Sequence, residues 1–383
     1  MIMRDSKELF IKRPFRGLAS LLLFLLTALP ALAVNGDVVL SEPLTVRWRY
    51  ASSVTLNLTP AFDNERVYLP LAGGILVALN AKDGQLFWRS EIGGELSASP
   101  AADESAIYVA SEILELGYAP SNSSGVLRAL GREGGVTQWL TPLVKPLRGA
   151  IAVSGNKLFA GGSDGRAYAF DKKTGGVYWS IPFSSSFSGA PVAKDGRVYF
   201  GSEDGTLLAL EESTGKVLWR YRTKGAIRGP VAASAGIVFF GSSDGYVYSV
   251  HADNGHLDWR KRTGAGVEAV LLSGETLLVA SLDNYAYLLN LKGSMLWKRL
   301  LPGRIAAQPL AVQEAALFTP LSSSTAVVLA LRDGKQVNTL PTGEEMTSSA
   351  APILVGDAVF VTTEHGLVAF ARPADTSVKQ KRQ

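Results

Sequence analysis

The tryptophans of this chain recur at one position of a repeat. Their successive spacings are 40, 51, 40, 40, 40 and 38 residues, and a glycine lies four residues before six of them. A fixed period of this length indicates an array of similar structural units, so it must be explained before any local motif. The seven tryptophans are Trp48, Trp88, Trp139, Trp179, Trp219, Trp259 and Trp297.

Each repeat is predicted to contain four short β-strands. In the copy that ends with Trp219, apolar segments at 190–193, 197–201, 206–210 and 216–221 are separated by polar turns. Asp204-Gly205 and Thr214-Gly215 supply the positive φ angles that tight reversals need. Four-stranded units of about 40 residues are typical of a β-propeller, in which neighbouring sheets cover each other's faces.

The copies can be counted to give an eight-bladed all-β propeller. Six copies end at a tryptophan after Trp48, and a seventh ends at Asn338, four residues after Gly334. Three further strands are expected at 351–354, 358–362 and 366–370, with no fourth after them. The strand at 45–50 carries Trp48 but has no preceding partners, so we expect it to complete the last blade and close the ring.

The ends of the chain differ from the repeats. Residues 1–33 combine five basic side chains with an apolar run that ends in Ala31-Leu32-Ala33, which predicts a cleaved signal peptide, with an uncleaved anchor helix as the alternative. Residues 34–43 are predicted to be a short linker, 44–371 the propeller, and 372–383 a disordered basic tail. The chain is therefore expected to be exported, with no direct membrane anchor.

Net charge and the absence of cysteine argue against several classes of protein. The formal net charge is +4, but residues 1–33 and 372–383 each carry +3, which leaves the body at −2. Nucleic acid is therefore not an expected partner. The sequence contains no cysteine, so an exported chain would depend on core packing rather than disulfides, and no cysteine is present for lipidation. We expect a monomer.

The repeat resembles a known family. The pattern Asp-Gly-x-(Ala/Leu)-x-Ala-(Leu/Phe)-x-x-x-Thr-Gly-x-x-x-Trp at 164–179 and 204–219 is similar to the pyrroloquinoline-quinone-type propeller repeat. The blade number and length most resemble the family of the outer-membrane protein assembly factor BamB. This resemblance implies a non-enzymatic scaffold for protein–protein interaction in the cell envelope, located in the periplasm, with the outer-membrane assembly machinery as the expected partner. It implies no catalytic residue, cofactor or metal.

The resemblance also implies a place for partner binding. The family contacts its partner through a Leu-x-Leu-Arg stretch, and the aligned position here reads Phe183-Ser184-Ser185-Ser186. Neighbouring repeats offer two similar apolar–basic pairs instead. The candidate partner-binding residues on this basis are Leu147, Arg148, Ile227 and Arg228.

One repeat carries an insertion. The copy that ends at Trp139 is 51 residues long, and its extra residues fall within 111–125. Ile113, Leu114, Leu116 and Tyr118 would project from one rim as a docking site, because exposed apolar residues on a long loop often bind partners. The alternative is a loop that folds back over its own blade.

Two enzyme-like motifs have simpler explanations. GGSDG at 161–165 and GSSDG at 241–245 fit the Gly-x-Ser-x-Gly pattern of hydrolases, but they recur at the repeat period and predict hairpin turns. His251 and His256 flank a turn without further metal ligands in the pattern.

A quinone-dependent oxidoreductase and a small-ligand sensor that uses the axial funnel remain the alternatives to a scaffold. Small residues in the first strands favour a tightly packed axis.

Overall fold

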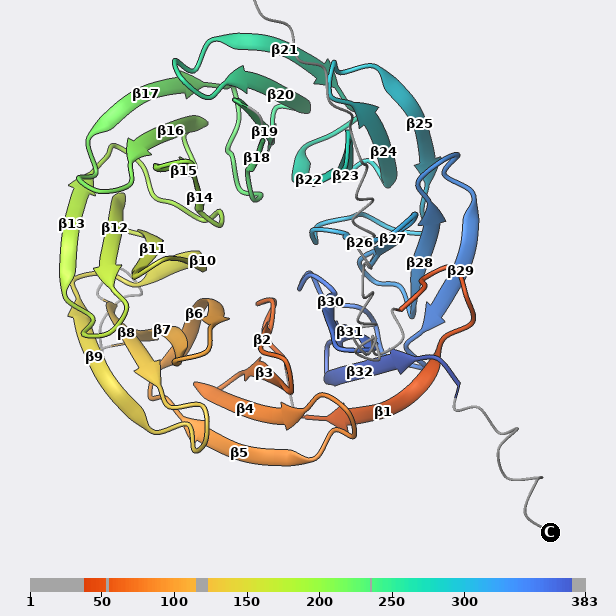
Figure 1. The fold of residues 1–383 in the computed structure, drawn as a ribbon, viewed down its shortest axis with the longest axis horizontal. Helices are drawn as coiled ribbons and strands as arrows, with labels where there is room; N and C mark the ends of the chain where they lie inside the picture. Colours follow the sequence, from red (N-terminus) through yellow and green to blue (C-terminus); the bar gives the residue numbers. More distant parts are fainter. Residues whose placement is uncertain (1–37, 53–54, 115–122, 235, 374–383) are drawn as a thin grey trace, which may run out of the picture. The chain divides into compact units, whose positions relative to one another are not determined.

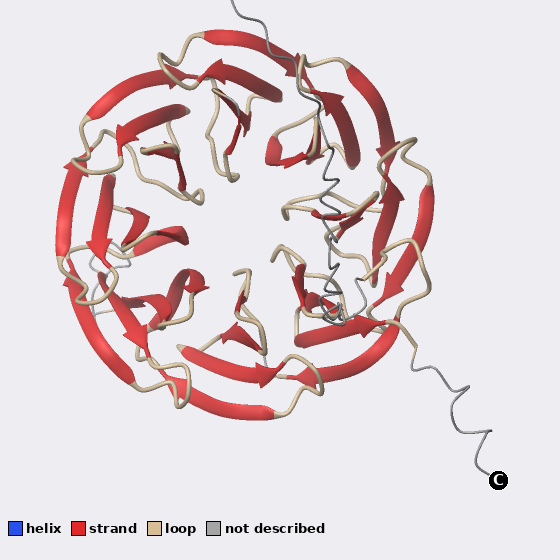
Figure 2. Ribbon diagram, viewed as in Figure 1, coloured by secondary structure: helices blue, strands red, loops and turns tan. Residues whose placement is uncertain are grey.

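The computed structural model describes residues 38–52, 55–114, 123–234 and 236–373. These residues form thirty-two β-strands and no helix (Figure 2). The strands build six sheets of four and one sheet of eight, arranged around a common axis (Figure 1). No helix in the described residues is long and apolar enough to cross a membrane.

The strands of each sheet follow one another along the chain, apart from β1. The first sheet contains β2 Ala61–Phe62, β3 Arg66–Leu71, β4 Ile75–Asn80 and β5 Leu86–Glu91. The sheet of eight contains β6 Glu95–Ala102, β7 Ile107–Ile113, β8 Ser124–Leu130, β9 Thr137–Leu143, β10 Leu147–Ser154, β11 Lys157–Gly162, β12 Arg166–Asp171 and β13 Val177–Pro182.

The remaining sheets have four strands each. They are β14 Val192–Lys194, β15 Arg197–Gly201, β16 Thr206–Glu211 and β17 Val217–Arg222; β18 Ala232–Ser234, β19 Ile237–Ser242, β20 Tyr246–His251 and β21 Leu257–Arg262; β22 Val267–Ser273, β23 Thr276–Ser281, β24 Tyr285–Asn290 and β25 Met295–Leu300; β26 Leu310–Val312, β27 Ala315–Phe318, β28 Thr325–Ala330 and β29 Gln336–Pro341; and β30 Ile353–Val355, β31 Ala358–Thr363 and β32 Gly366–Ala371 with β1 Thr45–Ala51.

Strand β1 pairs with the last strand of the chain. The ladder between β1 and β32 is antiparallel and runs from Thr45 opposite Ala371 to Ala51 opposite Gly366. The sheet order is therefore β1-β32-β31-β30, which joins strands that are more than 300 residues apart. In the sheet of eight, a single parallel pair, Ala150 opposite Ser99, joins β10 to β6.

The middle strands are apolar on both faces because each sheet is covered by its neighbours. The four central residues of β12, β16, β20 and β24 are all buried. The outermost strands differ, since β21 and β25 expose most of their residues. This gradient places the core between sheets and leaves the perimeter and axis as the accessible surfaces.

Each tryptophan of the repeat joins its own repeat to the next one. Its indole N–H donates to a backbone carbonyl that lies in a turn of the next sheet or, for Trp139, in the β12–β13 turn of the same eight-stranded sheet, at 2.7–3.2 Å. Buried tryptophan needs such a partner for its N–H, so the contact fixes both the ring and the neighbouring turn. The donor–acceptor pairs are Trp48–Ala81, Trp88–Arg132, Trp139–Lys172, Trp179–Glu212, Trp219–Ala252, Trp259–Leu291 and Trp297–Leu331.

The N-terminal segment 38–44 packs against the sheets. Val38, Leu40 and Leu44 are buried in one core cluster with residues of β27–β29, β31 and β32. Asn338, which stands where a repeat tryptophan is expected, donates its amide hydrogens to the carbonyls of Leu40 and Glu42 at 3.0 and 2.6 Å. The described part of the predicted linker is therefore core structure, because its apolar side chains fill the place next to Asn338.

Candidate functional site

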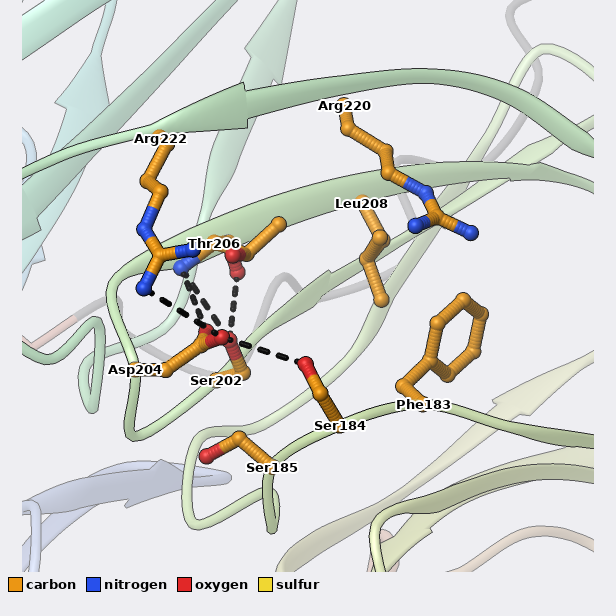
Figure 3. A pocket seen from close by; sticks show the side chains of 9 residues that line it. All are labelled: Phe183, Ser184, Ser185, Ser202, Asp204, Thr206, Leu208, Arg220 and Arg222. Carbon is orange, nitrogen blue, oxygen red and sulfur yellow. Dashed lines mark hydrogen bonds and ion pairs between the residues drawn. The ribbon is translucent and has the colours of Figure 1, made fainter.

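A pocket of about 200 Å³ opens between the segment that follows β13 and the β14–β17 sheet (Figure 3). Its walls come from the segment after β13, from the turn between β15 and β16, and from β16 and β17. We call it the Asp204 pocket. Its lining residues are Phe183, Ser184, Ser185, Ser202, Asp204, Thr206, Leu208, Arg220 and Arg222.

Polar groups gather at one end of the Asp204 pocket. Asp204 Oδ1 accepts from the hydroxyl of Ser202 at 2.6 Å and from the backbone N–H of Thr206 at 3.1 Å. Its Oδ2 accepts from Ser184 Oγ at 3.3 Å and lies 3.8 Å from Arg222 Nη2. Partial burial acts to raise the pKa of Asp204, but these hydrogen bonds and Arg222 outweigh it and hold the pKa below its usual value.

The other end of the pocket combines apolar groups with a cation. The guanidinium of Arg220 lies 5.5 Å from the ring centroid of Phe183, within the range of a cation–π interaction. Leu208 points into the space between these groups and the Asp204 carboxylate (Figure 3). The arrangement suits a ligand that is apolar at one end and donates a hydrogen bond at the other.

In each of the two predicted apolar–basic pairs, the apolar residue is buried and the arginine is accessible. Leu147 and Ile227 are fully buried within core clusters, so their side chains pack inside the protein. Arg148 donates to Glu112 Oε2 at 2.7 Å, and Arg228 forms a bidentate pair with Glu203 at 2.8–3.1 Å. Only the arginine of each pair is accessible at the surface, because the adjacent apolar residue is held by the hydrophobic core, and partner binding by Arg148 and Arg228 stays a prediction.

The insertion is described only in part. Ile113 ends β7 with 37% of its surface exposed, and Leu114 follows with 61% exposed. Leu116 and Tyr118 lie outside the described residues. The two described members of this candidate set are accessible, and docking at this rim stays a prediction.

A second hollow follows the axis. It has a volume of about 810 Å³ and is lined mainly by Ala, Gly, Pro and Ser from the first strands and the segments before them. The prediction of a tightly packed axis was therefore wrong: small side chains leave the centre open rather than closing it. Arg228 and Glu268 are the charged groups that line it, and burial raises the pKa of Glu268, partly offset by Arg228.

The enzyme-like motifs occupy turns and the perimeter. The serines of GGSDG and GSSDG, Ser163 and Ser243, lie in hairpin turns after β11 and β19, which confirms the prediction from their period. His251 and His256 are exposed on either side of the β20–β21 turn. Within the described residues, no group of three His, Asp or Glu side chains is placed to hold a metal ion.

Comparison with known families identifies the chain. A sequence profile described as "Outer membrane protein assembly factor BamB" matches residues 35–116, 123–260 and 205–382. The chain belongs to the BamB family. BamB proteins from Yersinia pestis and Shewanella oneidensis are each 31% identical over 108 and 106 residues, which cover 27% and 26% of this chain. These alignments span 25% and 24% of the two relatives, about a quarter of their length.

Solved structures agree at the level of fold. The crystal structure of BamB from Moraxella catarrhalis superposes with a TM-score of 0.72 at 15% identity, covering 86% of this chain and 100% of that one. The quinohemoprotein alcohol dehydrogenase ADHIIG from Pseudomonas putida HK5 gives 0.68 at 12% identity, covering 85% and 76%. At these identities the likeness shows a shared all-β, propeller-like fold and no more, since one fold serves many functions.

Sequence motifs taken one at a time did not predict most of the residues that line the Asp204 pocket. The family alignment led to Phe183, Ser184 and Ser185, and these residues line it. Leu208 and Arg220 come from strands that follow in the next repeat, and nothing in their local pattern sets them apart. Comparison of equivalent positions across the 40-residue period would have singled out Leu208.

Proposed function

We propose that this protein is a non-enzymatic scaffold that binds protein partners during outer-membrane protein assembly. The observation that carries the proposal is the BamB family match over nearly all residues after 34. A rigid arrangement of sheets presents its rim and pockets without further ordering, which lowers the entropic cost of binding. The signal-like residues 1–33 support export to the periplasm as part of the proposal.

We further infer an eight-bladed ring closed by β1. The sheet of eight divides into two sets of four antiparallel strands, because a single parallel pair joins them. Counted this way, the strands make eight blades, and the last contains β30–β32 together with β1. Pairing of β1 with β32 then covers the edge that a ring open at this point would expose.

The proposed binding surface includes the Asp204 pocket, the side chains of Arg148 and Arg228, and two residues at the end of β7. Arg148 and Arg228 keep their guanidinium groups accessible while salt bridges hold them in place, and Ile113 and Leu114 add apolar area. Arginine held in a fixed geometry is favoured at binding surfaces, since little side-chain entropy is lost on association.

The first test is direct binding. We expect the purified protein to form a saturable complex with the purified periplasmic region of the central outer-membrane assembly subunit from the same cells, measured by isothermal titration calorimetry. Arg228→Ala is expected to weaken the complex about tenfold, the loss typical of an arginine hot spot. Arg332→Ala changes an exposed arginine in the β28–β29 turn and serves as the control.

Two results would contradict the proposal. Absence of binding to the assembly subunit, with the protein folded, would remove its central claim. Normal outer-membrane protein levels in cells that lack this chain but retain the rest of the machinery would have the same consequence.

A second candidate function rests on the axial hollow. Its volume of about 810 Å³ lies in the range of small-molecule sites, and Arg228 offers a cation to an anionic ligand. A quinone-dependent oxidoreductase or a ligand-binding sensor would use such a space. Addition of pyrroloquinoline quinone and calcium, followed by absorbance and dye-linked oxidation, tests this alternative directly.

A further inference from the structure

A tyrosine–aspartate pair recurs on three strands, β12, β20 and β24. Tyr168 on β12 donates its hydroxyl to Asp164 Oδ2 at 2.8 Å, and Tyr248 on β20 donates to Asp244 Oδ2 at 2.7 Å. Tyr287 on β24 makes the same bond to Asp283 Oδ2. In each pair the tyrosine follows the aspartate by four residues, so the ring lies over the turn that begins its own strand.

The β14–β17 sheet breaks this series. The aspartate is present as Asp204, but the residue four positions later is Leu208 rather than tyrosine. Leu208 lies on β16 at the position that Tyr168 and Tyr248 occupy on their strands, 40 residues away in either direction. A leucine has neither the aromatic ring nor the hydroxyl donor of its counterparts.

The substitution also leaves the Asp204 carboxylate with weaker partners. In the next two sheets, Asp244 Oδ2 and Asp283 Oδ2 each accept a second bond, from the backbone N–H of Lys224 at 3.0 Å and of Gly264 at 2.7 Å. Asp204 Oδ2 instead has the hydroxyl of Ser184 at 3.3 Å and Arg222 at 3.8 Å. A carboxylate with this environment retains capacity for another strong donor.

The space beside Leu208 is large enough for a phenol ring. The pocket measures about 200 Å³, and a cavity of about 150 Å³ is known to hold a benzene molecule. Phe183 and Leu208 supply apolar walls, and Arg220 lies over the Phe183 ring (Figure 3). An aromatic ring here would contact carbon on two sides and keep its edge toward Asp204.

We propose that the Asp204 pocket binds a tyrosine side chain of a partner protein, with the ring against Phe183 and Leu208 and the hydroxyl donating to Asp204. The partner residue would thus supply the group that the chain itself supplies in the neighbouring sheets. The inference rests on the proposed scaffold function and names the side chain that the scaffold recognises. Arg222 and Ser184 would remain at the polar end of the site.

The test uses small probes with the intact protein. N-acetyl-tyrosinamide and N-acetyl-phenylalaninamide are titrated separately and followed by saturation-transfer NMR and calorimetry. We expect tyrosinamide to bind about tenfold more tightly, because a hydrogen bond to a charged group is lost with phenylalanine. Equal binding of the two probes, or binding of N-acetyl-aspartate in place of tyrosinamide, would overturn the proposal.

Two variants locate the binding to this pocket. Leu208→Tyr supplies the missing ring from within the chain and is expected to abolish tyrosinamide binding. Leu218→Tyr is the matched control, since Leu218 is an exposed residue of β17 outside the pocket lining. If Leu208→Tyr fails to fold, Asp204→Asn is used instead, and it should remove the preference for tyrosinamide over phenylalaninamide. Unchanged preference in that variant would reject the role of Asp204.

The outcomes separate this inference from the proposed function. If the assembly subunit binds equally well to the wild type and to Leu208→Tyr, and tyrosinamide does not compete, the scaffold function is supported and the tyrosine site is rejected. If tyrosinamide binds in the pocket but the assembly subunit does not bind at all, the tyrosine site is supported and its assignment to outer-membrane assembly is rejected.

Discussion

At the scale of single residues, the repeat tryptophan and the repeat glycine belong to one contact. The glycine that lies four residues before six of the tryptophans packs against the tryptophan of the preceding repeat. At Gly215 a Cβ would lie 2.7 Å from the Trp179 ring, and the backbone has φ of +73°. Glycine is therefore required twice, once by the left-handed turn and once by the close approach of the ring.

The first residue-scale prediction separates these two requirements. Gly215→Ala is expected to lower the free energy of unfolding by about 2–4 kcal/mol, since it adds a clash with Trp179 to the cost of positive φ. Gly196→Ala is the matched control, because Gly196 has the same φ of +73° and nothing within 4 Å of its Cβ position. It should cost only about 1 kcal/mol. Denaturant unfolding measures both, and equal losses would contradict the packing role of Trp179.

At the scale of elements, the outermost strands differ in what holds them to the next sheet. Strand β25 uses Trp297, whereas β29 carries Asn338 and holds the segment 38–44 instead. Leu40 is 1% exposed, so this segment buries apolar area as well as accepting the two hydrogen bonds. A salt bridge of 3.0 Å between Glu42 and Arg372 adds a contact near the last strand.

This arrangement predicts a specific effect of Asn338→Ala. Loss of the bonds to the Leu40 and Glu42 carbonyls is expected to lower the free energy of unfolding by about 1–2 kcal/mol. Gln336→Ala alters an exposed residue of the same strand and should be nearly neutral. In a chain that begins at residue 45, Asn338→Ala should have no further effect, because its acceptors are gone. If Asn338→Ala lowers the free energy of unfolding of the shortened chain by the same amount, Asn338 does not act through the Leu40 and Glu42 carbonyls.

At the scale of the whole molecule, the inferred closure ties both ends of the propeller into one sheet. The β1–β32 ladder joins residues 45–51 to 366–371, so the chain ends contribute to a single cooperative unit. The tryptophan of β1, Trp48, also donates to Ala81 in the β2–β5 sheet. Loss of β1 would expose one edge of β32 and would remove Trp48 from the core cluster that it shares with β3 and β4.

Truncation tests the closure. A chain that begins at residue 52 is expected to lose several degrees of melting temperature and to aggregate, because an unpaired edge strand and apolar surface become accessible. A chain that ends at residue 373 retains all thirty-two strands of the described residues and should melt like the chain that ends at residue 383. Circular dichroism and light scattering during heating report both changes. Identical melting of the two truncated chains would argue that the β1 pairing contributes little.

The repeat made much of the architecture predictable. Strand positions depend on turn chemistry and alternation, which act over a few residues, so Asp204-Gly205 and Thr214-Gly215 marked reversals correctly. The expected strand at 45–50 is observed as β1, which pairs with β32. These features follow from local conformational preferences that repeat in every copy.

The tertiary structure decided what local patterns could not. Burial of Leu147 and Ile227, packing of Leu40 against distant sheets and the open axis depend on which segments meet in space. The Asp204 pocket likewise exists because Phe183, in the segment after β13, and Leu208, on β16, line the same space. Sequence alone determined the strands and their repetition, since these arise from nearest-neighbour physics, whereas cavities and accessible charges arise only when non-local packing leaves space unfilled.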